Sequence, residues 1–168
     1  MPRVLTVILV ALLLAACGGP NLTGVDLEPL LIQSGDLPAG TGGGQVRDGA
    51  PQMFAQAPAP TKAIYQQLAR GSDQAGGVTV LLYAQPADRE AAYTTTLDGM
   101  GDTYPVDGIG EQAVMSQPID LLGLHGSDLL FRRCAAVVHV RFIDPNSPTD
   151  TLKAYGQRLD KRLQGVVC

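Results

Sequence analysis

The residues with the most obvious catalytic potential are a histidine, a serine and an acid in close succession: His125, Ser127 and Asp128. A hydrolase triad needs these residue types to converge in space, and adjacency along the chain does not provide that geometry. The Gly-x-Ser-x-Gly turn that exposes the nucleophile of many hydrolases is also missing from the sequence. We therefore expect that the chain is not an enzyme.

Two glycine-rich stretches could instead bind a nucleotide. Residues 108–113 read Gly-Ile-Gly-Glu-Gln-Ala, a loose form of the dinucleotide fingerprint. No strand pattern precedes them and no convincing helix pattern follows, so we expect a structural turn. The glycines at 42–44 are not followed by Gly-Lys-Ser/Thr, and we expect a loop there. The sequence thus predicts no cofactor.

Metal-binding residues are equally sparse. The chain has two histidines, too few for a zinc site once its cysteines are used elsewhere. Asp98, Asp102 and Asp107 lie near one another but lack the Asp-x-Asp-x-Asp spacing of a calcium loop, so we expect solvated surface acids. His139 and Arg141, with Arg132 on a neighbouring strand, could form a polar patch; we expect it to be the ordinary solvent-facing side of an antiparallel sheet.

The three cysteines carry the clearest chemistry. Cys17 lies at the end of an apolar N-terminal run, whereas Cys134 and Cys168 lie far from it in the C-terminal part of the chain. The latter two form an even pair, which in an oxidising compartment favours a disulfide. Such a bridge would close a loop of about 35 residues and stabilise the fold by roughly 3–4 kcal/mol in the chain-entropy model. Two free thiols or a redox pair is the alternative, but no Cys-x-x-Cys is present.

The N-terminal run has the features of a signal peptide. Arg3 precedes apolar residues from position 4 to 14, and two alanines follow. At 1.5 Å per residue the run spans only about 20 Å, against roughly 30 Å of hydrocarbon, so a permanent transmembrane helix is disfavoured. One interpretation of this run is an ordinary secretory signal, in which the cysteine at position 17 has no special role.

Leu14-Ala15-Ala16-Cys17 resembles the lipobox of bacterial lipoproteins. The resemblance implies that the Cys17 sulfur receives a diacylglycerol and that cleavage leaves Cys17 as the acylated N-terminus, anchored in a membrane. We accordingly expect a signal peptide at residues 1–16, the lipidated cysteine and a tether at 17–26, and a single extracytoplasmic domain at 27–168. Which membrane holds the protein stays open.

Composition supports one acidic domain. Cleavage before Cys17 would leave 152 of the 168 residues and remove Arg3, taking the formal net charge from −4 to −5. A chain of that length can bury one substantial core. Its acidic balance makes nucleic acid an unexpected partner.

Apolar periodicity predicts an α+β fold, with an antiparallel sheet of about five to six strands and two main helices. We expect a first helix at 86–98, begun by Pro86, and strands at 62–70, 78–83, 111–115, 129–132 and 136–143. Beyond Ser147 and Pro148, a helix is predicted by an apolar stripe at spacings of three, four and four: Leu152, Tyr155, Leu159 and Leu163.

Strand parity links this last helix to the cysteines. Cys134 has the parity of Val138 and Val140, so we expect the C-terminal helix to pack on that sheet face. A bond from Cys134 to Cys168 would then fasten the end of the helix to the sheet.

Four short motifs resemble small extracytoplasmic α+β domains of bacterial lipoproteins and receptor-kinase sensors. They are Asp-Leu-Pro-Ala-Gly at 36–40, the glycine motif at 108–113, Phe-Arg-Arg at 131–133 and the closing helix at 147–163. Such domains often carry a glycine turn after Phe-Arg-Arg, where this chain has Cys134-Ala135. The resemblance implies no established reaction, and many such domains are suspected of binding a ligand.

Two classes of function follow from these observations. The first is a lipid-anchored, sensor-like module that binds a ligand or another envelope protein. The alternative is a structural or interaction lipoprotein without a small-molecule pocket. An apolar cavity beneath the last helix would favour ligand binding, whereas a closed and filled core would favour interaction.

Overall fold

The computed structural model describes residues 21–33, 35–121, 123–144 and 148–168. The expected signal peptide and Cys17 lie outside these residues. Among the helices that are described, none combines the length and the hydropathy that crossing a bilayer requires.

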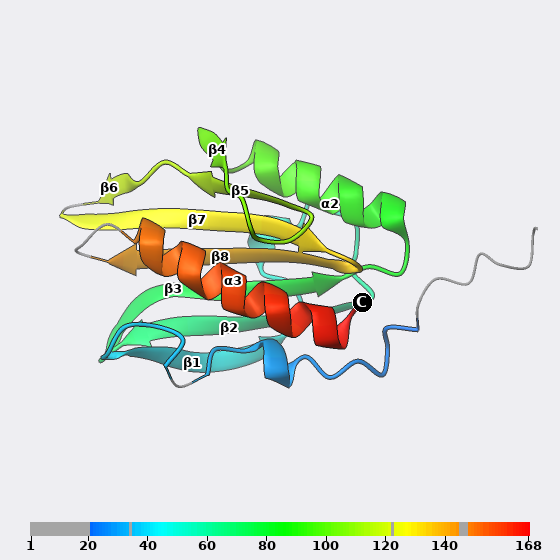
Figure 1. Cartoon of the computed structure of the whole chain (residues 1–168), viewed down its shortest axis with the longest axis horizontal. Helices are drawn as coiled ribbons and strands as arrows, with labels where there is room; N and C mark the ends of the chain where they lie inside the picture. The colour runs from blue at the N-terminus through cyan, green and yellow to red at the C-terminus, as the bar shows by residue number, and fades with distance from the viewer. Residues whose placement is uncertain (1–20, 34, 122, 145–147) are drawn as a thin grey trace, which may run out of the picture.

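One antiparallel sheet dominates the structure (Figure 1). Its strands follow the order β1-β2-β3-β8-β7-β5-β4, and β6 also pairs with β7. In chain order the strands are β1 (Thr41–Asp48), β2 (Lys62–Arg70), β3 (Asp73–Leu82), β4 (Thr103–Pro105), β5 (Gln112–Ser116), β6 (Ile119–Leu121), β7 (Leu124–Arg133) and β8 (Ala136–Asp144).

The centre of the sheet is the pair β3 and β8, which come from distant parts of the chain. Val80 lies opposite Val138 and Val78 opposite Val140. All four side chains are almost fully buried. Both strands are rich in β-branched residues, which pack well on a pleated surface.

The last helix, α3 (Thr149–Val166), covers one face of the sheet (Figure 1). The four residues of its predicted stripe are buried, and they join a cluster that contains Val138 and Val140. Gly156 permits α3 to approach β7 closely, because a Cβ at this position would lie 2.5 Å from a Leu129 methyl carbon. The predicted packing of the C-terminal helix on this face is confirmed.

The opposite face is also covered, which corrects the expectation of a solvent-facing side. Helix α2 (Pro86–Asp98) and the short 3-10 helix η2 (Gln52–Phe54) pack there. They bury a second apolar cluster, formed with strand residues that include Leu81, Leu130 and Val137. Sequence analysis missed this covering because α2 is only weakly amphipathic. Thr96 is buried within it, with its hydroxyl donating to the Ala92 carbonyl at 2.7 Å.

The N-terminal segment packs earlier than the expected domain boundary at residue 27. Leu22 is 3% exposed and belongs to the same core cluster as α3. The 3-10 helix η1 (Glu28–Leu30) adds Leu30, which is fully buried. The described part of the folded domain therefore includes residues that were expected to form the tether.

The strand count differs from the expected five to six. β1 contains the glycines that were predicted to form a loop, and its pairing with β2 is irregular between Gly43 and Val46. β4 and β6 have three residues each, too few for an alternating pattern to be visible in the sequence. The α+β class and the two main helices agree with the prediction.

Candidate functional site

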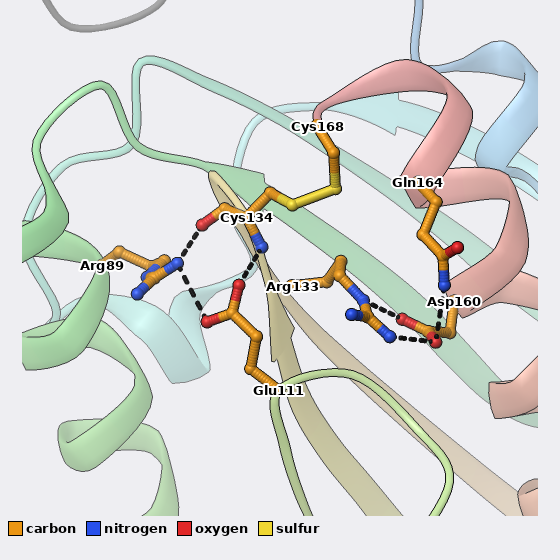
Figure 2. Close-up of a disulfide and its surroundings, with 7 residues drawn as sticks. All are labelled: Arg89, Glu111, Arg133, Cys134, Asp160, Gln164 and Cys168. Atoms are coloured by element: carbon orange, nitrogen blue, oxygen red, sulfur yellow. Dashed lines mark hydrogen bonds and ion pairs between the residues drawn. A yellow bond between two sulfur atoms is a disulfide. The ribbon is translucent and has the colours of Figure 1, made fainter.

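The two cysteines that were expected to pair are joined in the structure. Cys134 and Cys168 form a disulfide, with their Cα atoms 5.3 Å apart (Figure 2). Cys134 begins the two-residue turn between β7 and β8, and Cys168 follows the end of α3. The bond therefore fastens the last helix to the tip of the central hairpin.

The turn has an unusual backbone. Cys134 has a φ of +48°, in the left-handed region that side-chain-bearing residues rarely adopt. Such a conformation costs on the order of 1–2 kcal/mol relative to glycine. The disulfide and the surrounding contacts must offset this cost.

Both polar backbone groups of Cys134 have charged partners (Figure 2). Its N–H donates to Oε1 of Glu111 at 2.7 Å, and its carbonyl accepts from the Arg89 guanidinium. Arg89 and Glu111 also pair with each other at 3.3 Å. Helix α2, the loop before β5 and the hairpin turn thus meet at the disulfide.

The glycine motif at residues 108–113 places Glu111 in this arrangement. Gly110 has a φ of +61°, and a Cβ there would lie 2.4 Å from the Arg132 carbonyl oxygen. The Glu111 N–H donates to that same carbonyl at 2.8 Å. The motif is therefore a close-packed structural turn that presents a carboxylate to the disulfide loop.

A second ion pair holds α3 beside the disulfide. Arg133 donates two hydrogen bonds of 2.6 Å to the carboxylate of Asp160, which is 4% exposed (Figure 2). Burial alone would raise the pKa of Asp160. The Arg133 guanidinium and the Gly110 amide outweigh burial, so the pKa is lowered and the carboxylate stays charged.

A third charged cluster joins α3 to the loop before β1. The Asp36 carboxylate accepts hydrogen bonds from both terminal nitrogens of Arg162 at 2.7 Å and from the backbone N–H of Gln33 at 2.8 Å. Arg158 Nε lies 3.5 Å from Asp36 Oδ1. Burial again opposes ionisation, but these donors lower the Asp36 pKa. The first residue of the Asp-Leu-Pro-Ala-Gly motif is thus the anchor of the last helix.

The fourth cluster lies on the sheet face beneath η2. Asp128 Oδ1 is 2.8 Å from His139 Nε2, and Arg141 donates to both Asp128 oxygens at 2.8 and 2.9 Å. The ring of Phe54 packs edge-on against the His139 imidazole, with the two ring centroids 5.9 Å apart. Burial acts to raise the pKa of Asp128, but His139 and Arg141 outweigh it and lower the pKa.

This cluster replaces the polar patch predicted from His139, Arg141 and Arg132. His139 is 3% exposed, whereas the Arg141 side chain is 53% exposed. Arg132 shares the sheet face but pairs with Glu90 of α2 instead. The guanidinium of Arg141 occupies both Asp128 oxygens, and a carboxylate bound in this way is a poor general base.

The residues considered for a hydrolase triad do not all share one face of the sheet. Ser127 and Asp128 are neighbours on β7 and therefore point to opposite faces of the sheet. His125 lies opposite Asp144, near the end of the strand pair far from the disulfide. Asp98, Asp102 and Asp107 are all exposed, and the described part of the chain holds no group of three or more His, Cys, Asp or Glu residues suited to a metal ion.

The space beneath α3 is filled by side chains. Tyr155, Leu159 and Leu163 are each fully buried against Leu129 and Phe131 of β7 and the neighbouring strands. A filled core here favours an interaction lipoprotein over ligand binding in a pocket under the last helix.

Sequence reasoning missed the charged partners of this framework: Arg89, Glu111, Asp36 and Asp160. Each pair joins residues far apart in the chain, for example 126 positions for Asp36 and Arg162. A local hint existed for Glu111 and Asp36, each the single acid of a glycine-containing motif, whereas Asp160 lies in a charged stretch that gave no such hint.

The fold defines a small α+β domain with a disulfide-fastened C-terminal helix. No family model matches the chain, and no curated protein matches it in sequence. Its structure is similar to the crystal structure of the extracellular domain of PknH from Mycobacterium tuberculosis, with a TM-score of 0.54 and 12% sequence identity. The likeness covers 80% of this chain and 93% of that one, and it establishes similarity of fold.

Proposed function

We propose that the chain is a lipid-anchored protein of the bacterial cell envelope, whose extracytoplasmic domain is a sensor-like module that recognises a ligand or another envelope protein at its surface. The proposal assigns no reaction to the domain and no nucleic-acid partner.

The observation that carries the location is the use of the cysteines. Cys134 and Cys168 bond to each other, which supports an oxidising compartment and leaves Cys17 for acylation. Leu22 is the first buried residue that the structure describes, and it lies five positions after the cysteine proposed to be acylated. Five extended positions span at most about 18 Å, which would keep Leu22 and the domain close to the membrane.

Two observations support surface recognition. The core beneath α3 is filled, so the domain has no need of a ligand to complete its packing. Several buried carboxylates are also held by arginines that reach the surface, with the Arg141 and Arg158 side chains 53% and 44% exposed. Fixed and partly exposed guanidiniums are common recognition elements. The likeness of fold to a kinase extracellular domain is compatible with this role.

The alternative is a structural lipoprotein that binds no small molecule. The filled core beneath α3 favours this interpretation over a pocket under the helix, so binding itself has to be measured. Native mass spectrometry of the protein purified from membranes of its own host provides the test. We expect a reproducible additional mass from a bound molecule or protein, removed by mild denaturation. A spectrum with the free chain alone, under gentle conditions and at several growth stages, would reject the binding role.

A further inference from the structure

An open hollow lies between the loop before β1 and the first half of that strand. Its volume is about 590 Å³. The lining residues come from the loop (Ile32, Gln33, Gly35, Leu37, Pro38, Ala39 and Gly40), from β1 (Thr41, Gly42 and Gly43) and from β2 (Gln66). β1 is an edge strand, and among the described strands its hydrogen-bonded neighbour is β2. The unpaired edge of the β1 glycine segment, and the side of it that lines the hollow, are therefore accessible to a ligand.

Gln66 is the buried polar group in this hollow. The residue is 6% exposed, and its Oε1 accepts from the Ile32 N–H at 2.8 Å. This bond fixes the orientation of the amide, because a donor must face the oxygen. The Nε2 therefore points away from Ile32, and it donates no hydrogen bond to any residue that the structure describes.

Gly43 provides the room for this amide. An ideal Cβ at Gly43 would lie 2.0 Å from Gln66 Nε2 and 2.9 Å from its Cδ. The Gln66 side-chain amide thus occupies the space that a side chain at position 43 would take. Gly43 and Gln66 both line the hollow. A glycine at such a point in a strand permits the close approach of another backbone.

The remaining lining determines which chemistry fits. It contains no charged side chain, and it combines the aliphatic residues Ile32, Leu37 and Pro38 with exposed main chain. An anion or cation would find no counter-charge in it. Gln66 Nε2 faces the open hollow without an acceptor among the described residues, and an uncharged acceptor such as a carbonyl would take the place of water there.

We propose that this hollow binds an extended, uncharged peptide segment, whose main chain lies against the glycines of β1 and one of whose carbonyls accepts from Gln66 Nε2. Recognition of an extended peptide beside an edge strand relies on main-chain hydrogen bonds, which matches a lining of backbone and one amide. The inference rests on the proposed binding function and specifies its site.

The test is a titration of the isotopically labelled chain from residue 17, carrying Cys17→Ser and containing every residue of the described core. The probes are N-acetyl-tetraalanine N-methylamide and, separately, triacetylchitotriose. We expect the peptide to cause saturable shifts of the Gln66 side-chain amide and of the Gly42 and Gly43 backbone amides. The saccharide should leave these signals unchanged.

Matched variants identify the group responsible. Gln66→Glu keeps the acceptor for Ile32 but removes the donor, and should weaken peptide binding by about tenfold or more. Gln67→Glu makes the same change on the opposite face of β2 and should leave binding unchanged. Gly43→Ala displaces the flexible end of Gln66 and should act like Gln66→Glu, which keeps the test decisive if the carboxylate introduced by Gln66→Glu prevents folding.

Absence of saturable shifts at these amides, equal affinity of the Gln66 and Gln67 variants, or a response to the saccharide alone would each overturn the inference. Because native mass spectrometry detects binding anywhere on the domain, a negative titration with a positive spectrum would reject this hollow and leave the proposed function standing.

Discussion

Arg162 of α3 donates to both carboxylate oxygens of Asp36, at 2.7 Å each, across 126 positions of sequence. Asp36 is 4% exposed and the Arg162 side chain 21% exposed. The pair connects the loop that borders the proposed peptide site to the helix that covers the core. Stability of the fold and the shape of that site are therefore linked.

Removal of the Asp36 charge should be costly. We expect Asp36→Asn to lower the free energy of unfolding by about 2–3 kcal/mol, because it leaves a partly buried guanidinium without its counter-charge. Asp102→Asn, at an exposed acid, should change it by less than about 0.5 kcal/mol. Urea unfolding followed by circular dichroism measures both values, and equal stability of the two variants would show that the pair contributes nothing.

Acid should destabilise the domain through its buried carboxylates. The pKa values of Asp36, Asp128 and Asp160 all lie below the ordinary value of 3.8. A lowered folded-state pKa gives stability that is present above the unfolded pKa and is lost as the pH falls through the folded pKa. We therefore expect the free energy of unfolding to decline steeply below about pH 4.

The Asp36→Asn variant provides the control for this pH dependence. It lacks one of the three titrating carboxylates, so its free energy of unfolding should fall less steeply below about pH 4 than that of the unmodified chain. Identical slopes would mean that Asp36 has the same pKa in the folded and unfolded states.

The disulfide should account for a large share of the stability. We expect Cys134→Ser with Cys168→Ser to lower the free energy of unfolding by about 3–4 kcal/mol. Reductant should lower the melting temperature of the unmodified chain and leave that of the double variant unchanged. Equal melting of both proteins, with and without reductant, would mean that the leucines of α3 hold the helix alone.

The left-handed turn allows a more specific test. Cys134→Gly with Cys168→Ser also lacks the disulfide, but glycine adopts a φ of +48° without steric cost. This pair should be about 1 kcal/mol more stable than the double serine variant in urea unfolding. If the serine variant were equally stable, the turn would not require its positive φ once the bond is lost.

The predictable part of the fold is the part with local patterns. The stripe at Leu152, Tyr155, Leu159 and Leu163 identified α3, and Pro86 marked the start of α2, because helix periodicity and first-turn proline are both short-range features. The parity of Cys134 with Val138 and Val140 correctly indicated which face the helix covers.

The unpredicted part depends on contacts between distant segments. β1 reads as a glycine loop because its strand conformation is imposed by pairing with β2. His139 reads as solvent-facing because nothing in β8 reveals that Phe54 packs over it. Glu111 and Asp36 belong to motifs visible in the sequence, but their arginine partners could be assigned only from the structure.

Intact mass spectrometry of fractionated cells measures the proposed lipid attachment at Cys17 directly. The chain and its Cys17→Ser variant would be produced in a bacterial host and separated into membrane and soluble fractions. We predict that the unmodified chain is in the membrane fraction, starts at Cys17 and carries the added mass of a diacylglycerol and further acylation, and that Cys17→Ser is absent from that fraction in mature form. Recovery of Cys17→Ser in the membrane at the level of the unmodified chain, or an unmodified chain without lipid mass, would contradict the account.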